Sequence, residues 1–254
     1  MNLPDALLLA GAGFAAGTSN AIAGGGTLLS FPALLAVGYP ALTANVTNTV
    51  SVWPGYLSGA ASYRPELKGQ RDRIKALAPT SAAGAVVGTI ILLTAPPGVF
   101  SALVPFLVLS AVVLLGVQPR LSAWVQGRQA RKGETMAHRS IGLHAATFAG
   151  AIYGAYFGGG LGVILLGLLA VFVADALQRL NGLRSVLSLT INTVALVGFV
   201  AFAPVAWSAV AVIAPASLLG GFVGANLARR LNAKVLRYTV MAFGLAVAIR
   251  LFLT

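Results

Sequence analysis

The sequence has no cysteine and very little charge. Of its 254 residues, 9% are charged and 58% are hydrophobic, against about 25% and roughly 45–50% in a typical soluble domain. The lack of cysteine excludes disulfides, thiol catalysis, iron–sulfur clusters and cysteine-bound metal. Five acidic residues and two histidines supply little for a buried metal site, and no nucleophile–base pair is visible. We therefore expect no cofactor, no metal and no enzyme active site.

The chain is rich in hydrophobic residues, and its mean hydropathy is +0.89. Such composition predicts an all-α polytopic membrane protein, because a helix satisfies its own backbone hydrogen bonds in lipid. The hydrophobic stretches run over 5–38, 40–62, 76–95, 99–118, 140–174, 185–203, 205–228 and 235–253.

Two of these stretches are too long for one span. Residues 5–38 and 140–174 each exceed the roughly 20 residues that cross a core of about 30 Å. Each is interrupted by a triple glycine, at 24–26 and at 158–160. We expect two helical hairpins that enter the membrane and return to the same side. Irregular backbone is tolerated at that depth only where it is buried in protein or lines a wet cavity.

The two long segments begin two similar halves. Gly13-x3-Gly17 precedes the first triple glycine and Gly150-x3-Gly154 precedes the second, and three ordinary spans follow each hairpin. An odd number of spans inverts one half relative to the other. The sequence therefore predicts a first transmembrane repeat at 1–118, a cytoplasmic linker at 119–139 and an inverted repeat at 140–254.

The net charge of +12 supports this topology. Lysines and arginines cluster at 64–75, 120–139, 179–184 and 229–237. The inverted topology places these clusters on one side of the membrane, as the positive-inside tendency requires. Both termini then lie outside, and the basic residues contact lipid headgroups. We expect the lipid bilayer, and no nucleic acid, as the partner of this charge.

No span carries a carboxylate at its centre, which disfavours a pump built on Asp or Glu and a divalent-cation site. Glycine and neutral polar side chains suit an anion instead. Helix starts inside the membrane present unpaired N–H groups and the positive end of the helix dipole. The candidate substrate-binding residues are Asn20, Gly24, Gly25, Gly26, Thr27, Asn45, Thr47, Asn48, Gly158, Gly159, Gly160, Asn181, Arg184, Ser185 and Ser188.

Structural interpretations of the same residues stay open. Pairs such as Gly55-x3-Gly59 commonly let membrane helices pack closely, and isolated serines and threonines bond to their own helix carbonyls. Arg184 either fixes topology or offers a positive charge to an anion. His144 is either a hydrogen-bonded interfacial residue or a proton acceptor in a coupled cycle.

Four motifs follow one another along the chain. They are Asn20-Ala21-Ile22-Ala23-Gly24-Gly25-Gly26-Thr27, Ala44-Asn45-Val46-Thr47-Asn48, Gly158-Gly159-Gly160-Leu161-Gly162 and Leu180-Asn181-Gly182-Leu183-Arg184-Ser185. Their order resembles the sulfite exporter TauE/SafE family over nearly the whole chain. In the second half, Gly167 stands about where a proline is commoner in that family, and Asn181-Gly182-Leu183 departs from its usual pattern.

This resemblance implies a multi-pass transporter of the bacterial inner membrane. Its expected substrates are small sulfur-containing anions such as sulfite, thiosulfate and organosulfonates, including sulfoacetate. We therefore predict a secondary transporter, in the family's sense an exporter, that works by alternating access. A passive anion channel and a non-transporting membrane subunit of a larger complex are the alternatives. Protons remain open as a coupling ion, and the oligomeric state is unknown.

Overall fold

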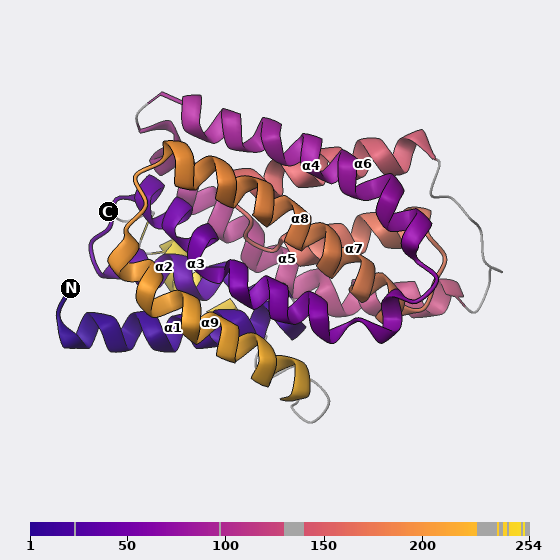
Figure 1. The fold of residues 1–254 in the computed structure, drawn as a ribbon, viewed down its shortest axis with the longest axis horizontal. Coiled ribbons are helices and arrows are strands. Elements are labelled where there is room, and N and C mark those ends of the chain that lie inside the picture. The colour runs from indigo at the N-terminus through magenta and orange to yellow at the C-terminus, as the bar shows by residue number, and fades with distance from the viewer. Residues whose placement is uncertain are drawn as a thin grey trace.

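The computed structural model describes residues 1–22, 24–96, 98–129 and 140–227, together with 238, 241–242, 244–249 and 251. The predicted basic cluster at 229–237, residues 130–139 of the linker and much of the last predicted span lie outside the described residues. The described chain is built of helices joined by short turns (Figure 1). These are α1 (Leu3–Ile22), α2 (Thr27–Ala36), α3 (Ala41–Ser62), the 3₁₀ helix η1 (Pro65–Leu67), α4 (Arg71–Thr94), α5 (Val99–Gln129), α6 (Ile141–Tyr156), α7 (Leu161–Phe172), α8 (Leu177–Phe202) and α9 (Trp207–Leu227).

Four of these helices are long and apolar enough to cross a membrane. They are α4, residues 99–121 of α5, α8, and residues 207–224 of α9. The prediction of an all-α polytopic membrane protein is thereby confirmed. The arms α2 and α7 are apolar but have only 10 and 12 residues, too few to span the bilayer at 1.5 Å per residue.

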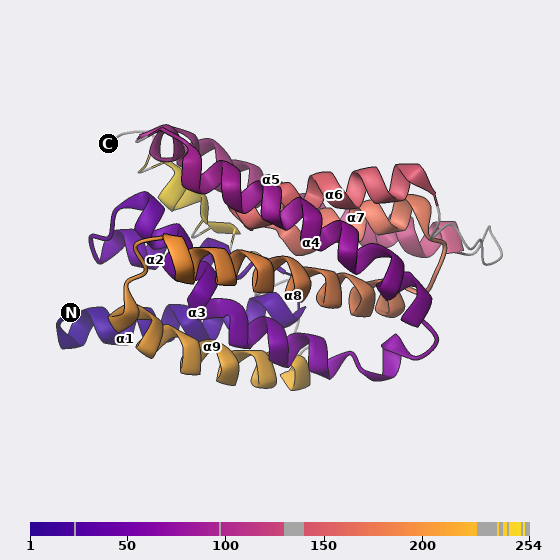
Figure 2. The same cartoon turned by 45° about the horizontal axis from the view of Figure 1, so that its top comes forward.

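Both overlong segments are broken at their triple glycine. In Figures 1 and 2, α2 runs back toward the end of the molecule where α1 begins, and α7 runs back toward the end where α6 begins. These two ends are opposite. We call the first the N-terminal end and the second, where α5 ends and α6 begins, the linker end.

Several helices extend beyond the apolar stretches from which they were predicted. α4 begins at Arg71 rather than near 76, α8 begins at Leu177 rather than near 185, and α5 continues to Gln129 within the predicted linker. Long charged side chains can lie along a helix end while their charged groups stay in water, so a helix continues beyond its apolar part.

Each hairpin packs against a helix of the other half of the chain, α1 against α9 and α6 against α4. Glycines allow these close approaches. A Cβ built on Gly17 would lie 2.0 Å from the carbonyl oxygen of Ser217, and one on Gly88 would lie 2.3 Å from that of Ile152. Small residues let membrane helices pack backbone to backbone. These contacts hold the tips of both hairpins inside the protein.

Candidate functional site

The first break is held by a side chain of the helix that precedes it. Gly24 has φ +79°, a left-handed conformation that favours glycine. Its N–H donates to the carbonyl of Ser19 at 2.9 Å. The N–H of Gly26 donates to Oδ1 of Asn20 at 2.8 Å, so the Asn20 carboxamide caps the start of α2. The Nδ2 of Asn20 is buried and has no hydrogen-bond partner among the described residues.

The second break has two left-handed glycines. Gly158 has φ +75° and Gly160, which precedes α7, has φ +72°. The hydroxyl of Tyr153 donates to the carbonyl of Gly159 at 2.6 Å. A side chain of the preceding helix therefore stabilises this break, as Asn20 does at the first. Here the side chain donates to a carbonyl, whereas Asn20 accepts from an amide.

The two breaks meet inside the bundle. A Cβ built on Gly24 would lie 2.7 Å from Cα of Gly162 and 2.6 Å from Nη1 of Arg184. The rings of Phe31 and Phe157 also join the two hairpins in a T-shaped contact, with centroids 5.5 Å apart. The first hairpin, the start of α7 and α8 thus converge at one point.

A cavity lies at this meeting point. It is small in this conformation, with about 10 Å³ open to the centre of a water-sized sphere, which is room for about one water molecule. The residues from α3 and α8 belong to the parts of those helices nearer the linker end. The lining residues are Asn20, Gly24, Gly55, Tyr56, Gly59, Ala60, Gly162, Arg184, Ser185 and Ser188.

Arg184 gives the cavity a positive lining. It is the one charged residue among those ten, and it is only 2% exposed. Its guanidinium interacts with the side chains of Tyr63 and Tyr56. A planar guanidinium presents several N–H donors in fixed directions, which suits oxygen atoms of an anion. Together with the Nδ2 of Asn20, it offers donors to an oxyanion.

The structure thus brings five of the predicted residues around the cavity: Asn20, Gly24, Arg184, Ser185 and Ser188. Thr27 interacts with the lining residue Tyr56. The carbonyl of Asn181 accepts a hydrogen bond from Ser185 at 2.8 Å. The other glycines of the two breaks do not line this cavity. Cβ atoms on Gly25 and Gly160 would approach α5, one on Gly159 would approach first the ring of Phe157 and then α5, and one on Gly26 would approach α1.

The polar cluster of α3 joins helices in this conformation. Nδ2 of Asn45 donates to the carbonyl of Tyr156 at 2.9 Å. Oγ1 of Thr47 accepts from the N–H of Ala206 at 2.9 Å. Oδ1 of Asn48 accepts a hydrogen bond from Ser30 in α2. These three predicted residues are buried but lie outside the residues that line the cavity.

Tyr56 is the lining residue that sequence reasoning missed most clearly. It lies between Gly55 and Gly59 of α3, a glycine pair whose expected role was helix packing. Gly55 does pack closely, with a built Cβ 3.0 Å from the carbonyl oxygen of Ser217. The nearby tyrosine among small residues is the signal that could have placed this face of α3 on the cavity.

His144 lies away from the cavity. Its Nδ1 is 2.7 Å from Oγ1 of Thr80, so it joins α6 to α4. Within the described part of the chain, no group of three or more His, Asp or Glu side chains is placed to hold a metal ion.

Comparison with known proteins bears on this arrangement. The model of the family described as "Sulfite exporter TauE/SafE" matches residues 9–251. The chain belongs to the sulfite exporter TauE/SafE family. The resemblance seen in the motifs is therefore confirmed. As a member of the TauE/SafE family, the chain is a membrane transporter and not an enzyme.

Two relatives align along most of their length with this TauE/SafE chain. A protein of Sinorhizobium sp. named "Probable membrane transporter protein ORF9" is 26% identical over 244 residues, which are 94% of this chain and 89% of the relative. A "Probable membrane transporter protein" of Haemophilus influenzae is 28% identical over 216 residues, 85% of this chain and 82% of the relative. No solved structure matches the chain.

Proposed function

We propose that this protein is a secondary transporter that exports small sulfur-containing anions across the bacterial inner membrane by alternating access. The observation that carries the proposal is the cavity where the two glycine breaks meet. Its lining contains one guanidinium, several hydroxyls and no carboxylate. Family membership points to the same class of substrate. Sulfite, thiosulfate and organosulfonates such as sulfoacetate all present oxygen atoms that accept hydrogen bonds.

The proposed ligands of the anion are the predicted residues that line the cavity. Arg184 supplies charge-assisted hydrogen bonds, Asn20 donates through Nδ2, and Ser188 adds a hydroxyl. The hydroxyl of Ser185 donates to the carbonyl of Asn181 in this conformation, so it must rotate before it can donate to the anion. The amides of Gly24 and Gly26 are already hydrogen-bonded within the first break. Side chains, rather than the backbone of that break, therefore provide most of the donors in this conformation. The other predicted ligands stay predictions.

The proposal includes two inverted repeats that move relative to each other. In support, α1 packs on α9 as α6 packs on α4, and α3 packs on α9 as α8 packs on α4. This exchange is expected when corresponding helices of two inverted halves surround one site. We assign the linker end to the cytoplasm, because the basic residues of 64–75 and Arg179 lie there.

Uptake into proteoliposomes tests the proposal. Purified protein is reconstituted, and entry of labelled sulfite, thiosulfate and sulfoacetate is followed with and without a pH gradient. We expect saturable entry of at least one anion and exchange against the same anion trapped inside. Saturable counterflow separates a carrier from a passive channel, and the response to the pH gradient shows whether protons are coupled. No flux of any of the three by folded protein would contradict the sulfur-anion assignment.

A further inference from the structure

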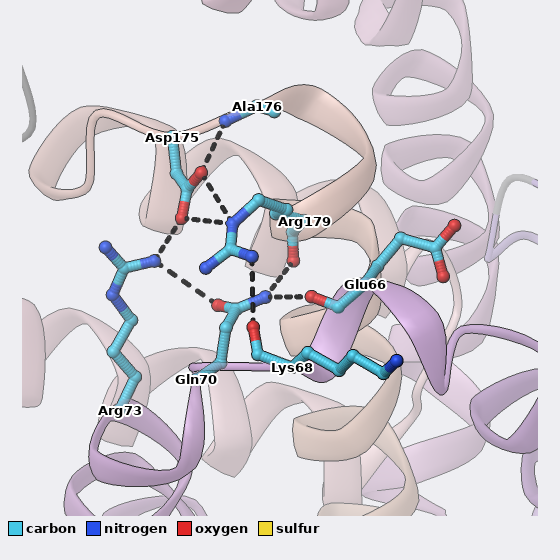
Figure 3. A network of polar contacts seen from close by, with 7 residues as sticks. All are labelled: Glu66, Lys68, Gln70, Arg73, Asp175, Ala176 and Arg179. Carbon is cyan, nitrogen blue, oxygen red and sulfur yellow. Dashed lines mark hydrogen bonds and ion pairs between the residues drawn. The ribbon is translucent and has the colours of Figure 1, made fainter.

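A polar cluster joins α4 to the beginning of α8 at the linker end (Figure 3). Asp175, in the turn before α8, forms ion pairs with Arg73 of α4 and Arg179 of α8. The Nε of Arg179 lies 2.9 Å from Oδ1 of Asp175. The backbone N–H of Ala176 donates to the same oxygen at 2.7 Å. One carboxylate thus holds groups from both halves of the chain.

Gln70, the residue before α4, completes this cluster. It is fully buried, and its Nε2 donates to the carbonyls of Glu66 and Arg179, both at 2.9 Å. Its Oε1 accepts from Nη1 of Arg73 at 3.3 Å. Nη1 of Arg179 also donates to the carbonyl of Lys68 at 3.0 Å. Figure 3 shows these bonds converging between η1, α4 and the start of α8. We call Gln70, Arg73, Asp175 and Arg179 the Asp175 cluster.

Asp175 and Arg73 are largely shielded from water, whereas the side chain of Arg179 is 34% exposed. The side chain of Asp175 is 5% exposed and that of Arg73 is 14% exposed. Burial by itself opposes ionisation of Asp175, but hydrogen bonds from Arg73 and Arg179 outweigh it and hold the pKa of the carboxyl below its ordinary value. The carboxylate is therefore ionised at neutral pH, and salt screens its shielded pair with Arg73 less than a pair on the surface.

The Asp175 cluster lies next to the cavity, on the side of the linker end. A Cβ built on Gly182 would lie 3.4 Å from Cβ of Glu66 and 3.6 Å from that of Tyr63. Tyr63 in turn interacts with Arg184, which lines the cavity. The segment that follows α3 therefore lies against the part of α8 that carries Arg184.

The contacts between the halves at the opposite end are of another kind. Thr47 accepts a hydrogen bond from the N–H of Ala206 at 2.9 Å. The hydroxyls of Tyr39 and Ser208 are 3.4 Å apart. These contacts involve neutral groups, and the second is long for a hydrogen bond between hydroxyls. The described ionic contacts that join the halves are at the linker end.

We propose that the Asp175 cluster is a latch that closes the cavity toward the linker end and must separate before a substrate passes between the cavity and that side. The inference rests on the proposed alternating access, because it identifies the contact that one of the two states must break. Asp175 positions Arg179 of α8, which bonds to Lys68 and Gln70 in the segment that follows α3. Because α3 packs mainly on α9 whereas α8 packs mainly on α4, movement of these two groups of helices relative to each other pulls those bonds apart. Both arginines then face the passage, where they can receive an anion.

The absence of cysteine makes a direct test possible. Ala60 lines the cavity and is buried, so Ala60→Cys provides a single reporter thiol. A membrane-impermeant maleimide is added to inside-out or right-side-out vesicles, and the labelling rate is measured without substrate. Lys68→Cys, at an exposed position of the linker end, shows separately which preparation presents that end to the reagent.

Adding Asp175→Asn to the Ala60→Cys variant should raise labelling of the reporter thiol from the linker end about tenfold and lower it from the other end. The equilibrium shifts toward the state that lacks the latch. Asp72→Asn, which neutralises an exposed carboxylate of the same helix end, should leave both rates unchanged. Equal rates with and without Asp175→Asn would overturn the proposal, as would a rise from both ends, which signals general loosening. Because no substrate is present, failure of the sulfur-anion assignment would leave this result unaffected.

Discussion

Burying Arg184 costs free energy, because its guanidinium gives up hydration that the protein interior must replace. Tyr56 and Tyr63 supply interactions with it from α3 and from the turn after α3. An oxyanion in the cavity would add an opposite charge and further acceptors. At the scale of single residues, the proposed site thus holds a buried positive charge that an anion would balance. Asn20 adds a neutral donor, since its Oδ1 caps α2 while its Nδ2 faces no described acceptor.

Among the glycines of the breaks, Gly24 is the position where substitution by alanine should reduce transport most. Gly24→Ala would force an alanine into a left-handed conformation, which costs roughly 1–2 kcal/mol. It would also place a carbon 2.7 Å from Cα of Gly162, which cannot move aside as a flexible side chain can. We expect uptake of the transported anion to be lost in proteoliposomes.

The matched control is Gly38→Ala. Gly38 has φ +98°, yet a Cβ there meets nothing within 4 Å. This variant carries the backbone strain without the collision, so it should lose some thermal stability and keep its uptake. Equal uptake by the two variants would mean that the meeting of the breaks has no role in transport.

The ionisation of Asp175 predicts a particular dependence of stability on pH. Hydrogen bonds from Arg73 of α4, Arg179 of α8 and the N–H of Ala176 hold its pKa below the ordinary value, against the effect of burial. A carboxyl group whose pKa is lower in the folded state stabilises that state at every pH above its unfolded-state pKa, which is about 3.9 for aspartate. That stabilisation is lost as the pH falls through the lower folded-state value.

Thermal unfolding of the detergent-solubilised protein at a series of pH values tests this contribution of Asp175 to stability. The difference in Tm between the parent and Asp175→Asn should stay constant from pH 8 to about 5 and shrink only at lower pH. A difference that disappears between pH 7 and 5 would show that the carboxylate is not held in its ionised form.

At the scale of helices, glycine has two separate roles. In the breaks it permits left-handed backbone, whereas on α1, α4 and α9 it permits close packing. The sequence predicted both breaks, because two overlong apolar segments with a triple glycine at corresponding places have few other solutions. It did not predict where α4, α5 and α8 begin or end, since their charged or polar ends carry no apolar signal. It also could not show that Asn45, Thr47 and Asn48 bond to other helices, because those partners are distant in the chain.

The packing role predicts different responses at two glycines of α1. A Cβ on Gly17 would lie 2.0 Å from the carbonyl oxygen of Ser217, whereas one on Gly11 meets nothing within 4 Å. Gly17→Ala should push α1 from α9 and destabilise the protein by about 1–3 kcal/mol, as overpacking does. Gly11→Ala should be close to neutral.

Thermal unfolding of Gly17→Ala and Gly11→Ala in the same detergent measures this difference in stability. A clearly lower Tm for Gly17→Ala alone is the expected outcome. Similar Tm values for the two variants would show that α1 and α9 do not pack as tightly as the structure indicates.

At the scale of the whole molecule, composition was sufficient to predict an all-α polytopic membrane protein, and motif order was sufficient to predict the transporter family. The cavity was only partly predictable. Its residues from the two breaks and from α8 lie in motifs, but Tyr56 and Ala60 come from an ordinary part of α3 and are recruited only by packing. The Asp175 cluster was not predicted at all. Arg73 and Asp175 are 102 residues apart, and in the sequence each is simply a charged residue at the end of an apolar stretch.

The central claim is that the cavity around Arg184 binds the transported anion, and uptake by Arg184→Gln tests it most directly. Loss of a charge-assisted hydrogen bond costs about 1.5–3 kcal/mol, so uptake at low substrate concentration should fall roughly 10- to 100-fold. Arg64→Gln, which removes an exposed arginine near the same end, should transport at the parental rate. Parental uptake by folded Arg184→Gln protein would contradict the account, because the anion would then have to bind elsewhere.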